Sequence, residues 1–276
     1  MLRSLLKKNT IVAIIFLFSG ISNIHSQENI GNDSISKADS IAVVSISAKF
    51  NPRSKHNKIT LTTNDKKSEI HYTLDGSEPT VEKPVFTRAL QLFGNGIVKA
   101  AAFKNGERIT EIDSIILVNH KAVGIKPEFS VEYGQEFNGG GKYGLTDGIR
   151  GGKNFNDGLW QRVKGGKFEF ILDLKLSKLI SKVTLGVLEC ADSSIYFPER
   201  VVLYGSQDGM EFKTVAELKN QIPTGESEIK LQDFSFQKRF KARFIKISAE
   251  IFSASSEYDS TAGKNIWILA DEIIVK

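Results

Sequence analysis

A glycine-rich stretch in the middle of the chain carries side chains that suit a polyhydroxylated ligand. Residues 134–166 hold eleven of the 23 glycines, which argues against a regular helix or a long central strand. We therefore expect a long, repeatedly turned loop that a sheet holds rigid, the alternative being a tolerated surface insertion. Asn154, Phe155 and Asp157 combine a stacking ring with amide and carboxylate groups that can hydrogen-bond vicinal hydroxyls.

Asp192 and Tyr196 offer the same chemistry in a second expected loop, at residues 190–197. Phe155 and Tyr196 lie outside the alternating strand patterns, so replacing either of them by alanine should reduce binding and leave the fold intact. For each of the five candidates, the alternative is an ordinary solvated loop residue.

No catalytic constellation is visible in the sequence. His56, His71 and His120 lack metal-ligand spacing, and we expect His71 to be a solvated strand residue. Cys190 is the only cysteine, so it cannot form an internal disulfide and is predicted to fill a small core or loop position. Paired carboxylates for glycoside hydrolysis must flank a cleft, which sequence spacing cannot show.

Short alternating segments surround the glycine-rich stretch on both sides. Apolar and polar residues alternate strictly over residues 44–50, and apolar residues recur at every second position over residues 168–176, which predicts half-buried strands. Asn105-Gly106 is a strong hairpin signal between two such segments. No segment has a sustained helical period, so the pattern indicates an all-β protein.

The chain begins with the features of a secretory signal. Three basic residues precede an apolar run at residues 11–21, which is shorter than the ~20 residues of a membrane-spanning helix. We expect cleavage near Ser26, so that residues 1–26 form a signal peptide and residues 27–41 a flexible tether. The alternative is that the apolar run is not cleaved and anchors the protein in the membrane. Removing the three cations takes the formal net charge from +5 to +2, and no Lys/Arg cluster elsewhere indicates nucleic-acid binding.

A first family resemblance lies in the N-terminal half. The sequence IHYTLDGSEPT at residues 70–80, with VKAAAFKNG at residues 98–106, resembles the small immunoglobulin-like domain at the C-terminal end of bacterial chitobiases and β-hexosaminidases. The resemblance covers residues 42–118 and implies an accessory domain without catalytic residues. Asp75 and Glu78 lie on its tight turn, where we expect Asx-type hydrogen bonds.

A second resemblance covers about residues 129–276. The sequence YFPERVVLYGSQDGMEFKTV at residues 196–215 resembles the discoidin, or coagulation-factor type C, domain. That fold is the galactose-binding-like jelly roll of family 32 carbohydrate-binding modules. YGLTDGIRGGKNFNDGLWQ at residues 143–161 and GKNIWILADEIIV at residues 263–275 resemble the version at the C-terminal end of family 20 β-hexosaminidases in Bacteroidetes-type bacteria.

Together the resemblances imply an all-β protein in which a small immunoglobulin-like β-sandwich precedes a discoidin-like, galactose-binding-like jelly-roll β-sandwich. We predict the two domains at residues 42–118 and 127–276. In a jelly roll, loops such as 150–158 and 190–197 can gather at one end of the sandwich. We therefore expect the candidate residues of the two loops to lie together.

The second resemblance also implies one structural Ca²⁺. Family 32 modules commonly hold this ion with a loop aspartate, backbone carbonyls and a glutamate near the C-terminus, and Asp147 and Glu272 fall at the matching positions. Calcium prefers hard oxygen ligands, which a tight turn supplies. Leu159 stands where those modules usually have a threonine, before Trp160. The alternative is that Asp147 caps its own turn.

The two tryptophans, Trp160 and Trp267, have two interpretations. The resemblance places both near strand ends in the core, which favours structural roles. The alternative is a platform for the apolar face of a pyranose ring.

We predict a protein that is not an enzyme and whose C-terminal domain binds a glycan or glycoconjugate. We expect it to be secreted, periplasmic or on the cell surface, with no transmembrane span after signal cleavage. A family 20 catalytic barrel needs ~250 residues, which residues 27–44 cannot supply. One alternative is a truncated or split β-N-acetylhexosaminidase. The other is a structural or adhesive module that binds a protein partner. The sequence leaves open which sugar is bound and whether a separate glycoside hydrolase takes part.

Overall fold

The computed structural model describes residues 41–129, 139–222, 228–252 and 266–276. Within these ranges the chain is almost entirely β-strand, which confirms the predicted fold class. The predicted signal peptide, and the tether up to residue 40, lie outside the described residues. No helix in the described part of the chain is long and apolar enough to cross a membrane.

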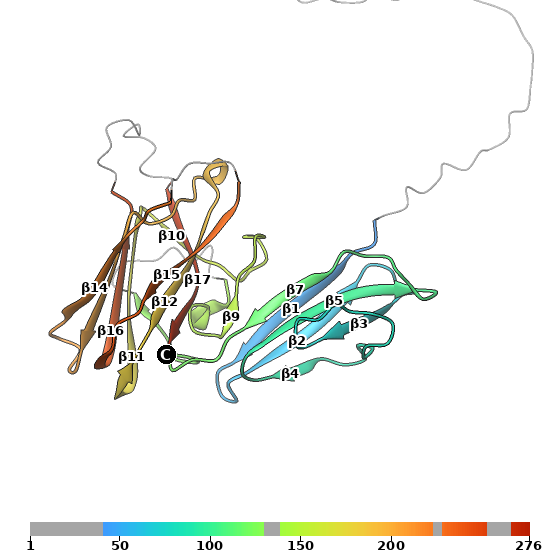
Figure 1. Cartoon of the computed structure of the whole chain (residues 1–276), viewed down its shortest axis with the longest axis horizontal. Helices are drawn as coiled ribbons and strands as arrows, with labels where there is room; N and C mark the ends of the chain where they lie inside the picture. Colours follow the sequence, from blue (N-terminus) through green and yellow to red (C-terminus); the bar gives the residue numbers. More distant parts are fainter. Residues whose placement is uncertain (1–40, 130–138, 223–227, 253–265) are drawn as a thin grey trace, which may run out of the picture. The chain divides into compact units, whose positions relative to one another are not determined.

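The first sandwich is built from two antiparallel sheets. One has the strand order β1-β2-β4, and the other has the order β3-β5-β7-β9 with β6 paired to β5 (Figure 1). The strand bounds are β1 (Val44–Asn51), β2 (His56–Thr63), β3 (Glu69–Thr73), β4 (Leu90–Leu92), β5 (Gly96–Lys104), β6 (Glu107–Arg108), β7 (Asp113–Leu117) and β9 (Ile149–Arg150). The alternation of β1 and β2 buries their apolar residues between the sheets, where Ile59, Val98 and Ala100 are fully covered.

Turn chemistry fixes two of the connections in this sandwich. Asn105 and Gly106 both have positive φ, at 53° and 86°, which is the conformation that a two-residue hairpin requires. The predicted β5–β6 hairpin is therefore confirmed. Asp75 Oδ1 accepts hydrogen bonds from the backbone N and the Oγ of Ser77, at 3.0 and 2.6 Å, which confirms the expected Asx turn.

The expectation that His71 is solvated is wrong. The residue is 4 % exposed, because the segment that pairs with β3 at Val85 brings a backbone carbonyl to its ring and Phe103 of β5 packs against it. His71 Nδ1 lies 2.8 Å from the Lys83 carbonyl oxygen, and its ring packs edge-on against Phe103 at 5.0 Å. His71 is a hydrogen-bonded core histidine.

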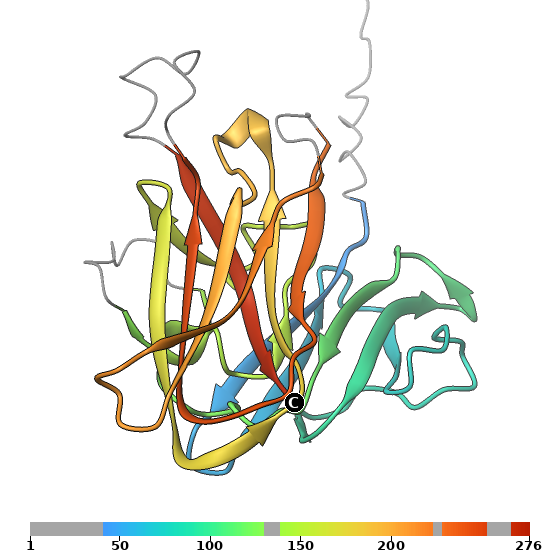
Figure 2. The same cartoon turned by 60° about the vertical axis from the view of Figure 1, so that its left-hand side comes forward.

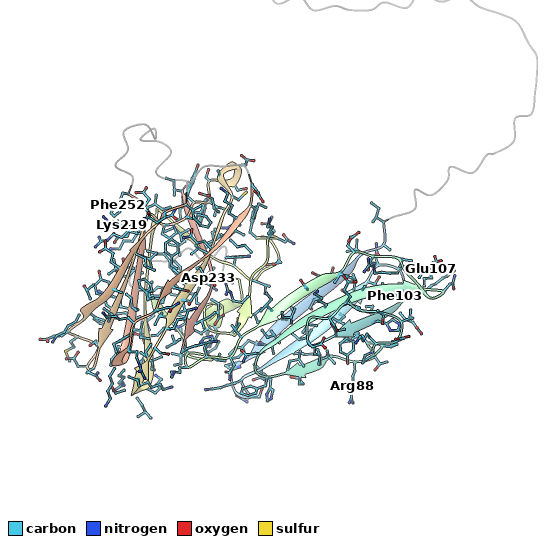
Figure 3. The ribbon with its side chains drawn as sticks, viewed as in Figure 1. Arg88, Phe103, Glu107, Lys219, Asp233 and Phe252 are labelled. Atoms are coloured by element: carbon cyan, nitrogen blue, oxygen red, sulfur yellow. The ribbon has the colours of Figure 1, made fainter. Side chains whose placement is uncertain are left out.

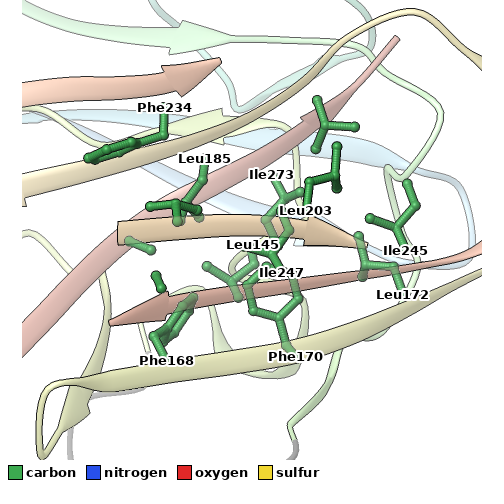
Figure 4. Packing of buried hydrophobic residues seen from close by; sticks show 14 of the residues in the cluster. Leu145, Phe168, Phe170, Leu172, Leu185, Leu203, Phe234, Ile245, Ile247 and Ile273 are labelled. Atoms are coloured by element: carbon green, nitrogen blue, oxygen red, sulfur yellow. The ribbon is translucent and has the colours of Figure 1, made fainter. Parts of the chain in front are cut away.

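The second sandwich packs a four-stranded sheet, β10-β17-β12-β15, against a five-stranded sheet, β14-β13-β16-β11-β8 (Figures 1 and 2). The bounds are β8 (Glu128–Phe129), β10 (Gln161–Lys164), β11 (Lys167–Ile180), β12 (Val183–Glu189), β13 (Arg200–Ser206), β14 (Lys213–Lys219), β15 (Lys230–Phe236), β16 (Phe240–Glu250) and β17 (Trp267–Val275). The alternating residues Phe168, Phe170 and Leu172 of β11 meet Leu185 and Ile273 of the facing sheet in the core (Figure 4).

The glycine-rich stretch contributes to both sandwiches. Its short strand β9 pairs with β7, with Leu117 opposite Ile149, and Ile149 is buried in the core of the first sandwich. At the end of the stretch, β10 pairs with β17 in the second sandwich. The residues between β9 and β10 form a loop whose two ends are both held by sheets, as expected for this stretch.

Candidate functional site

A small second apolar cluster lies on the face of the four-stranded sheet that points away from the main core. Its buried members are Trp160, Leu188, Cys190, Ile195 and Leu269. Leu188 and Leu269 come from the strands β12 and β17, and the loops 151–160 and 190–197 supply the rest. The two loops that carry the candidate residues are thus packed onto one apolar surface.

Trp160 is the centre of this cluster and is 4 % exposed, as its predicted structural role requires. Its Nε1 donates a hydrogen bond to the Gly152 carbonyl oxygen at 3.2 Å. Gly151 lies directly against the indole, where a larger side chain would collide with the ring. Trp160 therefore anchors the loop through packing and one hydrogen bond.

Trp267 is only half-buried, so the expectation that both tryptophans are core residues is only partly right. It lies at the start of β17, and Lys164 of β10 lies directly opposite in the sheet. The ring is 5.7 Å from Lys164 Nζ and 5.8 Å from the guanidinium carbon of Arg162. The same Arg162 carbon lies 5.7 Å from the ring of Phe155. We call Phe155, Arg162, Lys164 and Trp267 the Trp267 patch.

The loop 190–197 reaches the same patch through its backbone. Trp267 N donates to the Ser194 carbonyl oxygen at 2.9 Å, and Tyr196 N donates to the Trp267 carbonyl oxygen at 3.1 Å. This pairing places Tyr196 beside Trp267, and Phe155, about 40 positions earlier in the sequence, reaches the same patch through Arg162. Asp192 is exposed on the short 3-10 turn Ala191–Ser193 that precedes them.

Asn154 and Asp157 belong to another surface. Both line a pocket of about 760 Å³, together with residues 45–50 of β1 and residues 113–115 of β7. Asn154 Oδ1 accepts from Asn156 N at 3.2 Å, and Asp157 Oδ1 accepts from Leu159 N at 2.9 Å. These two side chains therefore stabilise the turns of the loop.

Asp147 and Glu272 lie together in the interior, with exposures of 3 % and 0 %. Asp147 Oδ1 accepts from Ile149 N at 2.9 Å, and Glu272 Oε2 accepts from Gly148 N at 3.2 Å. Burial, together with the repulsion of neighbouring carboxylates, raises the pKa of both carboxyl groups well above the usual value. Two carboxyl groups buried this close together need either a proton on one of them or a cation between them.

His120 completes the surroundings of Glu272. Its Nε2 lies 2.7 Å from Glu272 Oε1, and its Nδ1 accepts a hydrogen bond from Ala122 N at 3.2 Å. Burial lowers the pKa of His120 to about 3, so the ring is neutral and its proton sits on Nε2. The imidazole thus donates to Glu272 without neutralising it.

The donor set matches the oxygen chemistry that calcium prefers, because it offers two buried carboxylates, Asp147 on the turn before β9 and Glu272 on β17. Within the described residues, no group of three or more His, Cys, Asp or Glu side chains is placed to hold a metal ion. Backbone carbonyls would have to supply the remaining ligands. Gly140 supports this arrangement, since its backbone lies so close to Asp147 Oδ2 that a larger side chain would collide with it.

Asp271, the neighbour of Glu272, has a different role. Its Oδ2 accepts from Arg150 Nε at 2.6 Å and from Gly151 N at 3.0 Å. Arg150 also reaches Asp233 Oδ1 of β15 at 2.6 Å, and Figure 3 shows Asp233 on the second sandwich. These two ion pairs, in which only Asp271 is fully buried, tie β9 and the start of the loop to the four-stranded sheet.

Comparisons with known proteins give one family match and several similar folds. Residues 59–115 match the family model described as Fn3 associated. No curated protein sequence gives a match.

Three solved structures that are similar to part of the chain come from bacteria. Chitosan-binding module 1 of a chitosanase/glucanase from Paenibacillus sp. IK-5 has 13 % identity and a TM-score of 0.38, over 57 % of this chain and 98 % of that chain. A CBM32 module from Clostridium perfringens, in complex with GalNAc-β-1,3-galactose, has 19 % identity and a TM-score of 0.34, over 55 % and 94 %. The C-terminal domain of a chitobiase from Bacteroides fragilis has 13 % identity and a TM-score of 0.32, over 55 % and 93 %. These TM-scores are low, so function has to be inferred from the residues of this chain.

Proposed function

We propose that this protein is a non-catalytic glycan-binding protein and that the Trp267 patch is its binding site. The observation that carries the proposal is the position of two aromatic rings, Phe155 and Trp267, around one guanidinium group on the surface of the second sandwich. Aromatic faces pack against the apolar faces of pyranose rings, and charged groups beside them hydrogen-bond the hydroxyls.

The surrounding structure supports a binding role for this patch. The rings are presented by a loop anchored on Trp160 and by the first residue of β17, both of which are fixed by the sheet. A site on rigid elements loses little conformational entropy when a ligand binds. Because the patch lies on an open sheet face, we expect affinities in the micromolar to millimolar range, roughly −4 to −8 kcal/mol.

The proposal can be tested by screening the whole protein on a glycan array. Binding of at least one class of glycan, competed by the free sugar, is the expected result. Hydrolysis of nitrophenyl N-acetylglucosaminide above background would contradict the non-catalytic part of the proposal.

Phe155→Ala and Trp267→Ala should each weaken binding of the array-selected glycan by roughly tenfold, since an aromatic contact contributes about 0.5–1.5 kcal/mol beyond its buried area. Titration calorimetry measures the affinity. Phe93→Ala is the matched control, because Phe93 is 63 % exposed on the first sandwich. Full affinity in both patch variants would place the site elsewhere.

Two further proposals concern other parts of the chain. We propose that Asp147 and Glu272 hold one structural Ca²⁺, which would neutralise the two buried carboxylates and fix the turn that starts β9. We also propose that residues 1–26 direct secretion to the periplasm, cell surface or medium. The N-terminal sequence of the exported protein should then begin at Gln27; a retained N-terminus would contradict this.

A further inference from the structure

The pocket that Asn154 and Asp157 line is separate from the Trp267 patch. Its volume is about 760 Å³, which lies within the range of about 300–1,000 Å³ that is typical of ligand pockets. The lining comes from residues 45–50 of β1, residues 113–115 of β7 and parts of the glycine-rich stretch between residues 140 and 159. It includes no residue of the Trp267 patch. We call this space the β1 groove.

The edge strand β1 forms one wall of the groove. It pairs with β2 on one side, and on the other side Ile46 N donates a hydrogen bond to Asp113 Oδ2 at 2.7 Å. In an antiparallel pair, the backbone groups of every second residue point to the same side of the strand. The N–H and C=O of Ala48 therefore also point away from β2. Because Ala48 lines the groove, its backbone offers a ligand one donor and one acceptor.

The loop that follows β9 forms a second wall. Asn154 and Asp157 each use their Oδ1 atom to cap a turn of this loop. Within the described residues, neither Asn154 Nδ2 nor Asp157 Oδ2 makes a hydrogen bond, so both atoms remain for a ligand. The turns hold the two side chains in place before a ligand binds, which lowers the entropic cost of binding.

The walls do not suit an added peptide strand. Such a strand pairs continuously with the free edge of a sheet, whereas the Asp113 carboxylate already occupies Ile46 N. Shorter ligands that need only a few backbone contacts can still reach Ala48.

The charges of the lining disfavour an acidic ligand. Partial burial, together with repulsion from Asp113, raises the pKa of Asp157, so the two carboxyl groups are close enough for their charges to interact. Within the part of the chain that the structure describes, no cation forms an ion pair with either of them. Arg150, a cation of the lining, is already held by Asp233 and Asp271. A sugar hydroxyl suits this space better, because it donates one hydrogen bond and accepts others.

We propose that the β1 groove is a second glycan-binding site, formed jointly by the two sandwiches, and that its ligand is a neutral oligosaccharide. Asp157 accepts a hydrogen bond from a sugar hydroxyl, and Asn154 and the backbone of Ala48 donate to sugar oxygens. The first sandwich thus contributes to binding through β1. The site acts independently of the Trp267 patch.

The experiment follows the backbone amide signals of the whole protein by NMR during titration with named probes. Cellotetraose, chitotetraose and the methyl ester of tetragalacturonate are the neutral probes, and tetragalacturonate is the acidic one. At least one neutral probe should shift the amides of residues 45–50 and 113–115, with a dissociation constant roughly in the micromolar to millimolar range. Tetragalacturonate should bind the groove at least fivefold more weakly than that probe. All titrations contain excess Ca²⁺, because Asp147 also lines the groove.

Two isosteric variants test the loop wall. Asp157→Asn and Asn154→Asp keep the oxygen that caps each turn and change only the atom that remains for a ligand. Each should weaken binding in the groove by about threefold to tenfold, the usual loss for one hydrogen bond. Asn156→Asp makes the same exchange at an exposed neighbour outside the lining, and it should keep the wild-type affinity. Trp267→Ala should also leave the groove unaffected.

The outcomes separate this site from the Trp267 patch. Shifts of the Trp267 indole signal without shifts in residues 45–50 and 113–115 would overturn the second site and leave the proposed function standing. The absence of shifts in these residues with every neutral probe would also overturn it. Tighter or equal binding of tetragalacturonate would overturn the neutral ligand class. Unchanged affinity in both loop variants would overturn the assignment to Asn154 and Asp157, and loss of groove binding in Trp267→Ala would overturn the independence of the two sites.

Discussion

Replacing Trp160 by alanine should destabilise the second sandwich by about 3–5 kcal/mol, which is the usual loss when a buried aromatic side chain is truncated. Trp160 is 4 % exposed and packs with residues from both loops and from two strands. The melting temperature should fall by roughly 6–20 °C, since each kcal/mol shifts it by ~2–4 °C in a domain of this size. Thermal unfolding followed by circular dichroism measures this change.

Two controls make the result specific. Trp160→Phe keeps a ring in the cluster and should lose less stability than Trp160→Ala. Trp267→Ala removes a half-buried ring and should shift the melting temperature by only a few degrees. A Trp160→Ala protein that melts with the wild type would show that the cluster does not hold the loop.

Calcium should raise the melting temperature of the wild-type protein, and Asp147→Asn should remove most of that increase. A ligand at 100 to 1,000 times its dissociation constant stabilises the folded state by about 2.7–4.1 kcal/mol. The asparagine keeps the acceptor for Ile149 N but removes one of the two buried charges. Calorimetry in excess Ca²⁺ and in excess chelator, with elemental analysis of the purified protein, measures the effect. Identical curves and no bound metal would exclude the site.

The dependence on pH separates a bound cation from a shared proton. In chelator, the raised pKa of Asp147 and of Glu272 means that both carboxyls stabilise the fold at low pH and lose that contribution as the pH rises through their folded-state pKa values. The melting temperature of the wild type, relative to Asp147→Asn, should then rise as the pH is lowered from 8 to 5. In excess Ca²⁺ the same difference should fall, because protons compete with the metal.

Strand patterns in the sequence were sufficient to predict the class of fold. The alternation at residues 168–176 corresponds to β11, and Asn105-Gly106 corresponds to a hairpin. Both features can be predicted from a short stretch of sequence. The alternation shows which face of a strand is buried, and the residue types at a turn show where positive φ is tolerated. His71 could not be predicted in the same way, since the segment that covers it lies more than ten residues away.

The candidate site was predicted only in part, for the same reason. Phe155 was recognisable as a ring in a polar loop, and it does lie beside the loop 190–197. Arg162 and Lys164 gave no sequence signal, because their role depends on the pairing of β10 with β17, more than a hundred residues later. Once a strand is assigned at residues 161–164, the alternation around buried Val163 is the one signal that could have placed both cations on the outer face.

The pairing of Asp147 with Glu272 was predicted from a family resemblance and not from a local sequence pattern. Asp147 and Glu272 are 125 positions apart, and only the resemblance to family 32 modules suggested that they act together. The structure places them in contact, but also adds His120, which the spacing of histidines did not single out.

The central claim is that a glycan binds at Trp267, and the chain offers a direct probe because it contains only two tryptophans. Trp160→Phe leaves Trp267 as the sole indole, and Trp267→Phe leaves the buried Trp160. Saturating the Trp160→Phe protein with the array-selected glycan should shift the emission of Trp267 and reduce its quenching by acrylamide at least twofold. The Trp267→Phe protein should show neither change. Binding confirmed by calorimetry that leaves the emission and quenching of Trp267 unaltered would contradict the account.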